Sequence, residues 1–148
     1  MKKSESNLGK TLLKSLLIYL VVFLGLAGSV FSNEIVAVGT PLVKIESGFQ
    51  GSTRVELDAQ KRSEYLVVID FDGQNYRWKT RENKILNLSK SGIFYTFHAF
   101  DGSGYVKIGD MSALSQSSEK QYFYMEHLIL GLETITYWGV VQNYGLER

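Results

Sequence analysis

The sequence predicts an all-β fold, a small antiparallel sandwich or barrel of about seven to nine strands, preceded by one N-terminal hydrophobic helix. Three observations predict the β part. From residue 34 onward the chain is rich in Val, Ile, Thr and aromatic residues, and it holds every Phe and Tyr except Tyr19, Phe23 and Phe31. Glycines separate these runs, with a single proline in the chain. Two stretches also alternate in side-chain type on both sides of a glycine turn, which is typical of hairpins.

The first 32 residues are predicted to be a segment apart from the β domain of residues 33–148. Residues 15–32 carry no charge and follow a lysine-rich start. As a helix this run would be about 27 Å long, close to the roughly 30 Å of a hydrocarbon core. It is predicted to be an uncleaved signal anchor or a signal peptide cut after Ser29 or Ser32. The lysine cluster argues against the alternative, a core helix of a cytoplasmic protein.

Both versions of this leader place the β domain outside the cytoplasm, in the cell envelope. The domain would be anchored to the inner membrane through residues 15–32, or periplasmic or secreted if the leader is removed. The 16 Lys and Arg nearly balance the 15 Asp and Glu, so nucleic acid is not an expected partner. The absence of cysteine excludes disulfides, thiolate metal sites, a cysteine nucleophile and a lipoprotein anchor.

The first elements of the domain are predicted to be strands near residues 35–38, 42–45 and 53–57. A hairpin follows over residues 65–80, with its turn at Asp72-Gly73, and a shorter strand over 85–88. Asp70 and Asp72 are expected on the solvated face of the hairpin, near Arg77 and Lys79 as cross-strand pairs. The alternation places these side chains toward the core: Tyr65, Val67, Ile69, Phe71, Tyr76 and Trp78.

A second hairpin is predicted over residues 93–108, with its turn at residues 101–104. Both faces of its first strand are largely apolar, which predicts a central strand covered on both sides. Residues 109–120 have the composition of a loop. The tail is predicted to form two strands that meet at residues 130–132. A helix is the alternative, because Glu119, Glu126 and Glu133 recur every seven residues.

No motif predicts a metal, a cofactor or a known catalytic mechanism. His98 and His127 are the only histidines, and their separation does not suggest a metal site. The alternate carboxylates Asp70 and Asp72 before Gly73 resemble a fragment of a calcium loop, but the remaining ligands are missing. The glycines at 102 and 104 precede a strand instead of a helix, so they do not form a phosphate loop.

The sequence therefore predicts a binding module or a small structural subunit of an envelope assembly, without catalysis. Its partners would be other envelope or membrane proteins, or a small ligand. The alternatives are a small hydrolase that uses His98 with Asp101 or Asp110, and a barrel that carries a ligand in an apolar cavity. For Trp78 and Trp138, a place in the core competes with a place in a binding site. The candidate binding residues are Tyr76, Trp78, His98, Asp101, Tyr105, Tyr137 and Trp138.

Overall fold

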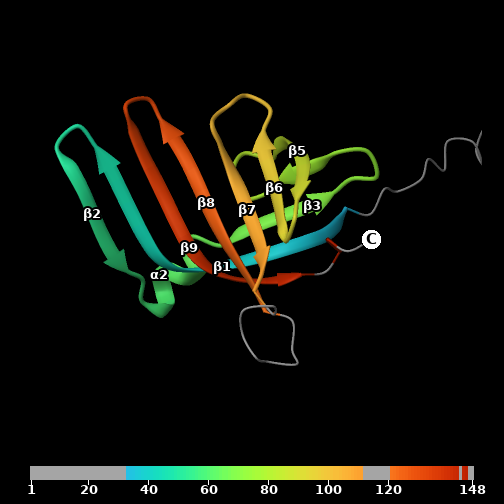
Figure 1. Cartoon of the computed structure of the whole chain (residues 1–148), viewed down its shortest axis with the longest axis horizontal. Helices are drawn as coiled ribbons and strands as arrows, with labels where there is room; N and C mark the ends of the chain where they lie inside the picture. Colours follow the sequence, from blue (N-terminus) through green and yellow to red (C-terminus); the bar gives the residue numbers. More distant parts are fainter. Residues whose placement is uncertain (1–32, 112–120, 144, 147–148) are drawn as a thin grey trace, which may run out of the picture. The chain divides into compact units, whose positions relative to one another are not determined.

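The computed structural model describes residues 33–111, 121–143 and 145–146, which form an all-β domain with one short helix (Figure 1). The predicted leader and most of the predicted loop over 109–120 lie outside the described residues. Within the described part, no helix has the length and apolar character needed to cross a membrane. The elements are β1 (Glu34–Gly48), β2 (Gly51–Glu56), α2 (Ala59–Glu64), β3 (Val67–Phe71), β4 (Tyr76–Trp78), β5 (Lys84–Ser91), β6 (Phe94–Ala99), β7 (Gly104–Asp110), β8 (Tyr122–Leu130) and β9 (Glu133–Asn143).

Eight of the strands close into an antiparallel barrel. The order is β1-β3-β4-β5-β6-β7-β8-β9, and β9 pairs with β1 to complete the ring. Strand β2 is the additional strand and pairs with β1. The all-β prediction is confirmed, and the architecture is a barrel.

Strand β1 has three partners because it is 15 residues long. Residues 37–47 pair with β9 along one edge. On the other edge, residues 34–39 pair with β3 and residues 43–48 pair with β2. The register shifts between Ile35 and Ala37 and between Pro41 and Val43. Such irregularities bend a strand, which lets the second half of β1 leave β3 and form a hairpin with β2.

The two ends of the barrel carry different loops. One end has the turns at residues 49–50, 100–103 and 131–132, and we call it the hairpin end. At the other end lie Asn33, where the described domain begins, and Asn143, where β9 ends. We call this second end the terminal end.

Aromatic and aliphatic side chains fill the interior. Trp78, Phe97 and Tyr124 are among the fully buried side chains. The ring of Tyr76 packs between Phe71 and Phe97, with centroid distances of 5.0 and 5.3 Å. Eight strands enclose a space that side chains alone can fill. The packing of these rings on one another gives no support to a carrier with an apolar internal cavity.

Most of the predicted strands are confirmed. The hairpins over 65–80 and 93–108 correspond to β3–β4 and β6–β7. The tail forms β8 and β9, which meet at residues 131–132, so the helix alternative is wrong. The strands predicted at 35–38 and 42–45 are one continuous strand, β1. Helix α2 was not predicted, because its six residues are too few for a periodic pattern.

The start of α2 depends on Asp58. Its Oδ1 atom accepts a hydrogen bond from the backbone N–H of Lys61 at 2.9 Å. The Asp58→Ala variant is therefore expected to lose about 1 kcal/mol of unfolding free energy, measured by urea denaturation. Asp58→Asn keeps an acceptor at the cap and should lose much less. Equal losses in the two variants would contradict a capping role.

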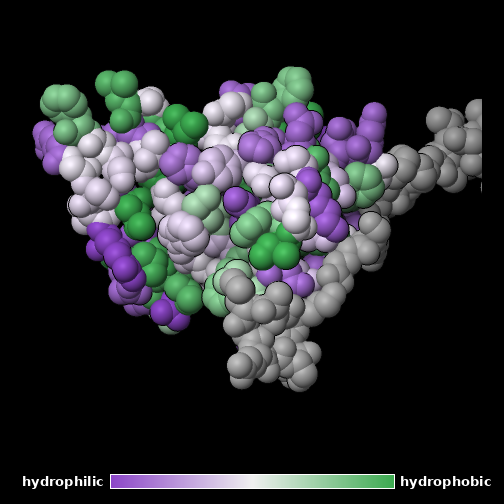
Figure 2. Space-filling model, viewed as in Figure 1, coloured by the Kyte–Doolittle hydropathy of each residue, from purple (hydrophilic) through white to green (hydrophobic). Residues whose placement is uncertain are grey.

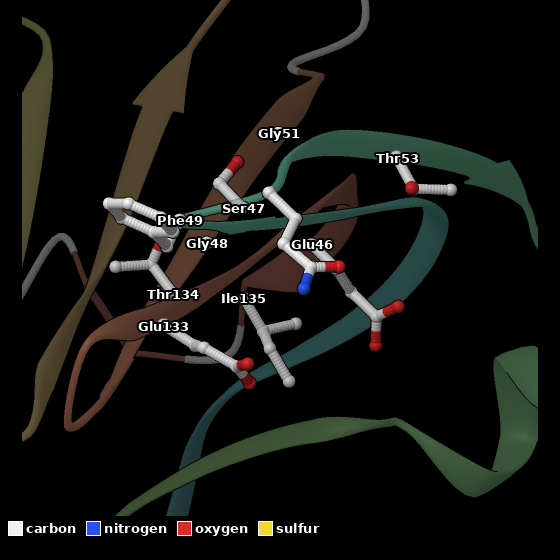
Figure 3. A pocket seen from close by; sticks show the side chains of 10 residues that line it. Glu46, Ser47, Gly48, Phe49, Gly51, Thr53, Glu133, Thr134 and Ile135 are labelled. Carbon is white, nitrogen blue, oxygen red and sulfur yellow. The ribbon is translucent and has the colours of Figure 1, made fainter.

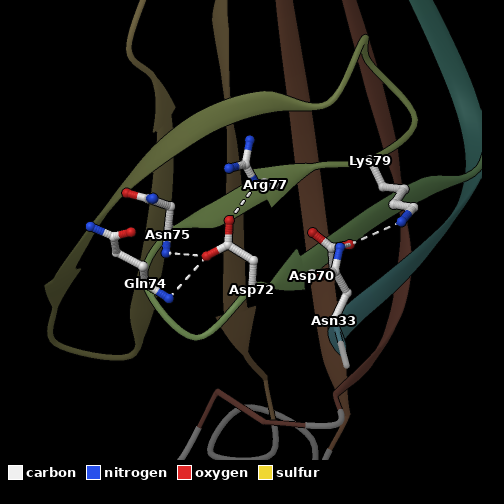
Figure 4. A network of polar contacts seen from close by, with 7 residues as sticks. All are labelled: Asn33, Asp70, Asp72, Gln74, Asn75, Arg77 and Lys79. Carbon is white, nitrogen blue, oxygen red and sulfur yellow. Dashed lines mark hydrogen bonds and ion pairs between the residues drawn. The ribbon is translucent and has the colours of Figure 1, made fainter. Parts of the chain in front are cut away.

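The turn between β3 and β4 is organised by Asp72 (Figure 4). Its Oδ1 atom accepts hydrogen bonds from the backbone amides of Gln74 and Asn75 at 2.9 and 2.7 Å. Its Oδ2 atom accepts one from Arg77 Nε at 2.5 Å. The Asn75 amide, followed by Arg77, lowers the pKa of Asp72 to about 2. These bonds account for the Asp-Gly pair as turn chemistry.

Asp70, which precedes this turn on β3, is not on a solvated face as predicted. It is 1% exposed, and its Oδ2 atom accepts a hydrogen bond from Asn33 Nδ2 at 2.9 Å. Lys79 Nζ lies 3.3 Å from the same oxygen. Arg77 and Lys79 were predicted to lie near these two acids, and the ion pairs Asp72–Arg77 and Asp70–Lys79 are present. The predicted exposure of Asp70 is wrong because Asn33 and Lys79 pack against its carboxylate.

A second acidic group, Glu126 on β8, is fully buried. Its Oε2 atom accepts a hydrogen bond from Arg81 at 2.9 Å, while its Oε1 atom is buried without a hydrogen bond. Burial raises the pKa of Glu126 to about 7, although the charge and hydrogen bond of Arg81 oppose the rise. The Trp78 indole also lies near enough to favour the charged form, without forming a hydrogen bond of normal geometry.

Candidate binding face

The outer surface of β6 to β9 carries exposed apolar side chains where a lone barrel would carry polar ones. Side chains alternate between the inside and the outside of the barrel along each strand. Residues next to a buried one therefore point outward, and these include Phe94, Phe123, Trp138 and Val140. Their exposed fractions are 36, 42, 47 and 42%. Exposed apolar groups that adjoin one another typically mark an interaction site. We call the following set the aromatic face: Phe94, His98, Tyr105, Phe123, Met125, His127, Trp138 and Val140.

The strand register places the members of the aromatic face side by side. Phe94, Gly109, Phe123 and Val140 are successive cross-strand partners on β6, β7, β8 and β9. A Cβ atom on Gly109 would come within 2.8 Å of the Phe94 ring. The missing side chain at Gly109 therefore lets the Phe94 ring lie across β7, so that the apolar surface is continuous over all these strands.

A cleft of about 440 Å³ opens on this face. Lys107 is the charged residue among the described residues that line it, and its Nζ atom lies 4.3 Å from the centre of the Phe94 ring. The ammonium group thus leans over an aromatic ring. The cleft is lined by Phe94, Lys107, Gly109, Met111, Phe123, Tyr124, Met125 and Trp138.

Nearer the hairpin end, a row of three rings continues the aromatic face. Tyr105 lies between the two histidines of the chain, with ring centroids 5.8 Å from His98 and 5.3 Å from His127. These residues are cross-strand partners on β6, β7 and β8. The Nδ1 atom of His127 forms a 2.9 Å hydrogen bond with Thr136 Oγ1. Because Tyr105 separates the histidines, they do not share a ligand site.

The structure divides the seven candidate binding residues into three groups. His98, Tyr105 and Trp138 lie together on the aromatic face. Trp78 and Tyr137 are buried, and Tyr76 packs against the core. These three residues belong to the interior. Of the two alternatives for Trp78, a place in the core or in a binding site, the structure therefore supports the core. The competing core explanation for Trp138 is wrong, since nearly half of its surface is exposed.

Asp101, the remaining candidate, belongs to the turn between β6 and β7. Its carboxylate accepts hydrogen bonds from Lys84 Nζ at 2.7 Å and from Ser103 Oγ at 2.6 Å. The Lys84 ammonium is the largest cause that lowers the pKa of Asp101 below its ordinary value. The partners described for this carboxylate are thus Lys84 and Ser103, and His98 is not one of them.

Asp110 is also unsuited to a pair with His98. His98 pairs with Tyr105, and Asp110 ends β7 five residues further along, at the terminal end. At about 3.3 Å per residue, these backbone positions are roughly 16 Å apart along the strand. The hydrolase alternative therefore lacks an observation in its favour. Within the described residues, no group of three or more His, Cys, Asp or Glu could hold a metal ion.

Comparison with known proteins gives no family for this chain. No protein-family model, no curated protein and no solved structure matches it. The function is therefore inferred from the geometry and from the sequence itself.

Five members of the aromatic face were not among the predicted binding residues: Phe94, Phe123, Met125, His127 and Val140. A signal for Phe94 was present, because both faces of the strand over 93–100 are largely apolar. The sequence suggested that other parts of the fold cover the second face. In the barrel, one face of β6 lines the interior and the other is the outer surface, so the apolar side chains on it are exposed.

A second group of exposed apolar residues lies at the hairpin end. Phe49, Leu132 and Phe100 are 102, 94 and 79% exposed, each in a different turn. Figure 2 shows hydrophobic residues at the tips of the β1–β2 and β8–β9 hairpins. Between these two hairpins lies a cleft of about 480 Å³, with Phe49 on one side and Glu133 and Ile135 from β9 on another (Figure 3). Each of these three residues is a single exposed side chain in its own turn, and Leu132 serves below as a control for the aromatic face.

Proposed function

We propose that the protein is a non-catalytic binding module of the cell envelope that docks onto a partner protein through the aromatic face. The observation that carries this proposal is the continuous apolar surface over β6, β7, β8 and β9. Docking would remove Phe94, Phe123 and Trp138 from water, and burial of a large side chain contributes about 1.5–3 kcal/mol. Aromatic side chains and Met are also enriched at the centres of protein interfaces.

A protein partner fits this face better than a small polar ligand. The cleft offers aromatic rings, two methionines and a glycine, but few groups that could donate or accept hydrogen bonds. A sugar or a charged metabolite would lose hydrogen bonds to water there without replacement. An apolar segment of another protein has few such hydrogen bonds to lose. The envelope location comes from the predicted leader and is part of the proposal.

The proposal can be tested in the cells that make the protein, with the full chain carrying a photoreactive phenylalanine at one position. Protein adducts are expected from position 123 of the aromatic face and not from position 132 in the β8–β9 turn, although Leu132 is more exposed. In the same chain, Trp138→Ser should reduce the yield from position 123 by about tenfold, which corresponds to about 1.4 kcal/mol of binding. The matched control Leu132→Ser should leave that yield unchanged.

Two results would overturn the proposal. One is an equal yield of adducts from position 132 and from position 123. The other is an absence of protein adducts at position 123 while the protein is folded and correctly located.

A further inference from the structure

Strand β2 has a free edge. Within the described residues, β2 pairs with β1 alone. The other two partners of β1 are β3, on the same edge of β1 as β2, and β9, on the opposite edge. Neither of them pairs with β2. Five of its six residues are exposed, and only Val55 is partly buried. In Figure 1, β2 lies at the margin of the domain with no strand beyond it. A free edge of this kind presents unpaired backbone groups to another strand.

The register identifies the backbone groups on this free edge. The N–H of Leu57, directly after β2, donates to the carbonyl of Leu42 on β1 at 2.9 Å. Backbone groups alternate in direction along a strand, so residues 51, 53 and 55 also face β1. Ser52, Arg54 and Glu56 therefore turn their N–H and C=O groups away from the domain.

The side chains of this edge carry complementary charges. Arg54 and Glu56 lie on the same side of β2, form a 2.7 Å ion pair, and are both 67% exposed. In an antiparallel pairing of β2 with itself, a register centred on Val55 places Arg54 of each copy opposite Glu56 of the other. A register centred on Arg54 would instead oppose two arginines. Opposite charges on facing residues stabilise strand pairs, and like charges destabilise them.

We propose that β2 pairs with β2 of a second copy of this chain, antiparallel and in the register centred on Val55. The backbone groups of Arg54 and Glu56 form the hydrogen bonds across the two-fold axis, and their side chains form two reciprocal ion pairs. The sheets of the two barrels thereby become one continuous sheet. A single short strand buries little area, so the isolated dimer is weak, and local concentration at a membrane would favour it.

The pairing would also bring two aromatic faces together. Arg54 pairs with Ile45, Ile45 with Thr136, and Thr136 with His127, so Arg54 lies on the same side of the sheet as the aromatic face. The dimer would present two docking sites on one surface. This consequence rests on the proposed function, whereas the pairing of β2 does not.

The absence of cysteine from the chain makes the register directly testable. In the full-length protein, Val55→Cys places a thiol opposite its own copy at a non-hydrogen-bonded position, where Cα atoms are about 4.5 Å apart and a disulfide can form. Oxidation is expected to give a cross-linked dimer. Thr53→Cys is the matched control: in this register it faces Leu57, and the two thiols are too far apart to react.

Charge reversal then tests the ion pairs in the Val55→Cys background. Arg54→Glu and Glu56→Arg are each expected to reduce cross-linking by about tenfold, or about 1.4 kcal/mol. The double variant should restore it. If β2 paired instead with a strand of another protein, exchanging the two charges within this chain would not restore the pairing. Failure of the double variant to restore cross-linking would therefore overturn the proposal. So would equal cross-linking of Val55→Cys and Thr53→Cys, or no dimer from Val55→Cys while circular dichroism shows an intact fold. None of these results depends on the partner of the aromatic face.

Discussion

Replacing Arg81 by alanine is expected to destabilise the protein by about 3–5 kcal/mol at pH 8. The variant leaves the fully buried carboxylate of Glu126 without its hydrogen bond and without its nearest positive charge. A buried charge that loses its partner retains the cost of leaving water. The measurement is urea denaturation of the variant and the wild type at the same pH.

The same variant should be far less destabilised at pH 5. Below pH 4.5 Glu126 is protonated in both the folded and the unfolded chain. In the wild type, between pH 4.5 and about 7, the unfolded chain releases this proton while the folded chain keeps it. The unfolding free energy of the wild type therefore falls as pH rises through this window. At about 1.4 kcal/mol per pH unit, the full loss is roughly 3 kcal/mol. At pH 5 the carboxyl group of Glu126 is neutral in the folded protein, so the loss of Arg81 should lower the unfolding free energy only slightly.

Glu126→Gln is the matched control for this mechanism. It keeps the size of the side chain and removes its charge, so the contribution of this residue to the pH dependence should disappear. Combined with Arg81→Ala, it should recover much of the stability lost at pH 8. An equal destabilisation by Arg81→Ala at pH 5 and pH 8 would show that Arg81 acts by packing and not through the charge of Glu126.

Replacing Gly139 by alanine is expected to cost at least about 3 kcal/mol and to open the contact that closes the barrel. Gly139 on β9 faces Pro41 on β1, beside the register shift of β1. A Cβ atom there would lie 2.0 Å from the backbone oxygen of Thr40. Backbone cannot move aside as a side chain can, so the two strands would have to separate. Thermal unfolding measures the loss.

Gly48→Ala provides the control, since Gly48 lies on β1 in the adjoining hairpin. Its added Cβ would meet the Glu133 side chain at 3.3 Å, and that flexible side chain can shift. The loss at this position should be below about 1 kcal/mol. If the two glycine variants were equally stable, the close approach of β1 and β9 at Gly139 would not be important for closure.

The local pattern of the sequence was sufficient to predict the strands. Alternation around Asp72-Gly73 and around residues 101–104 placed two hairpins correctly, because side-chain direction in a strand depends only on position along the chain. The tail was assigned correctly from strand propensity, since Tyr122, Tyr124 and Tyr137 belong to strand-forming runs. Three of the predicted binding residues, His98, Tyr105 and Trp138, were also placed on one face by the structure.

The same pattern could not distinguish which face of a strand is covered. Asp70 was expected on a solvated face, and no local pattern marked Glu126 as an interior residue, yet both are buried. Their partners Asn33 and Arg81 are 37 and 45 residues away in the chain. No local pattern contains such a pairing. Phe94 shows the opposite case, since its strand was expected to be covered on both sides and its side chain is exposed.

The amino-acid sequence by itself determined the β class, the positions of most strands and the turns between them, because alternation and turn chemistry act over a few residues. The tertiary structure alone decided that the strands close into a ring with β2 left outside it, and that the aromatic face is exposed. Closure depends on the approach of β1 and β9, about a hundred residues apart in the chain. Which side chains meet solvent follows from that long-range contact.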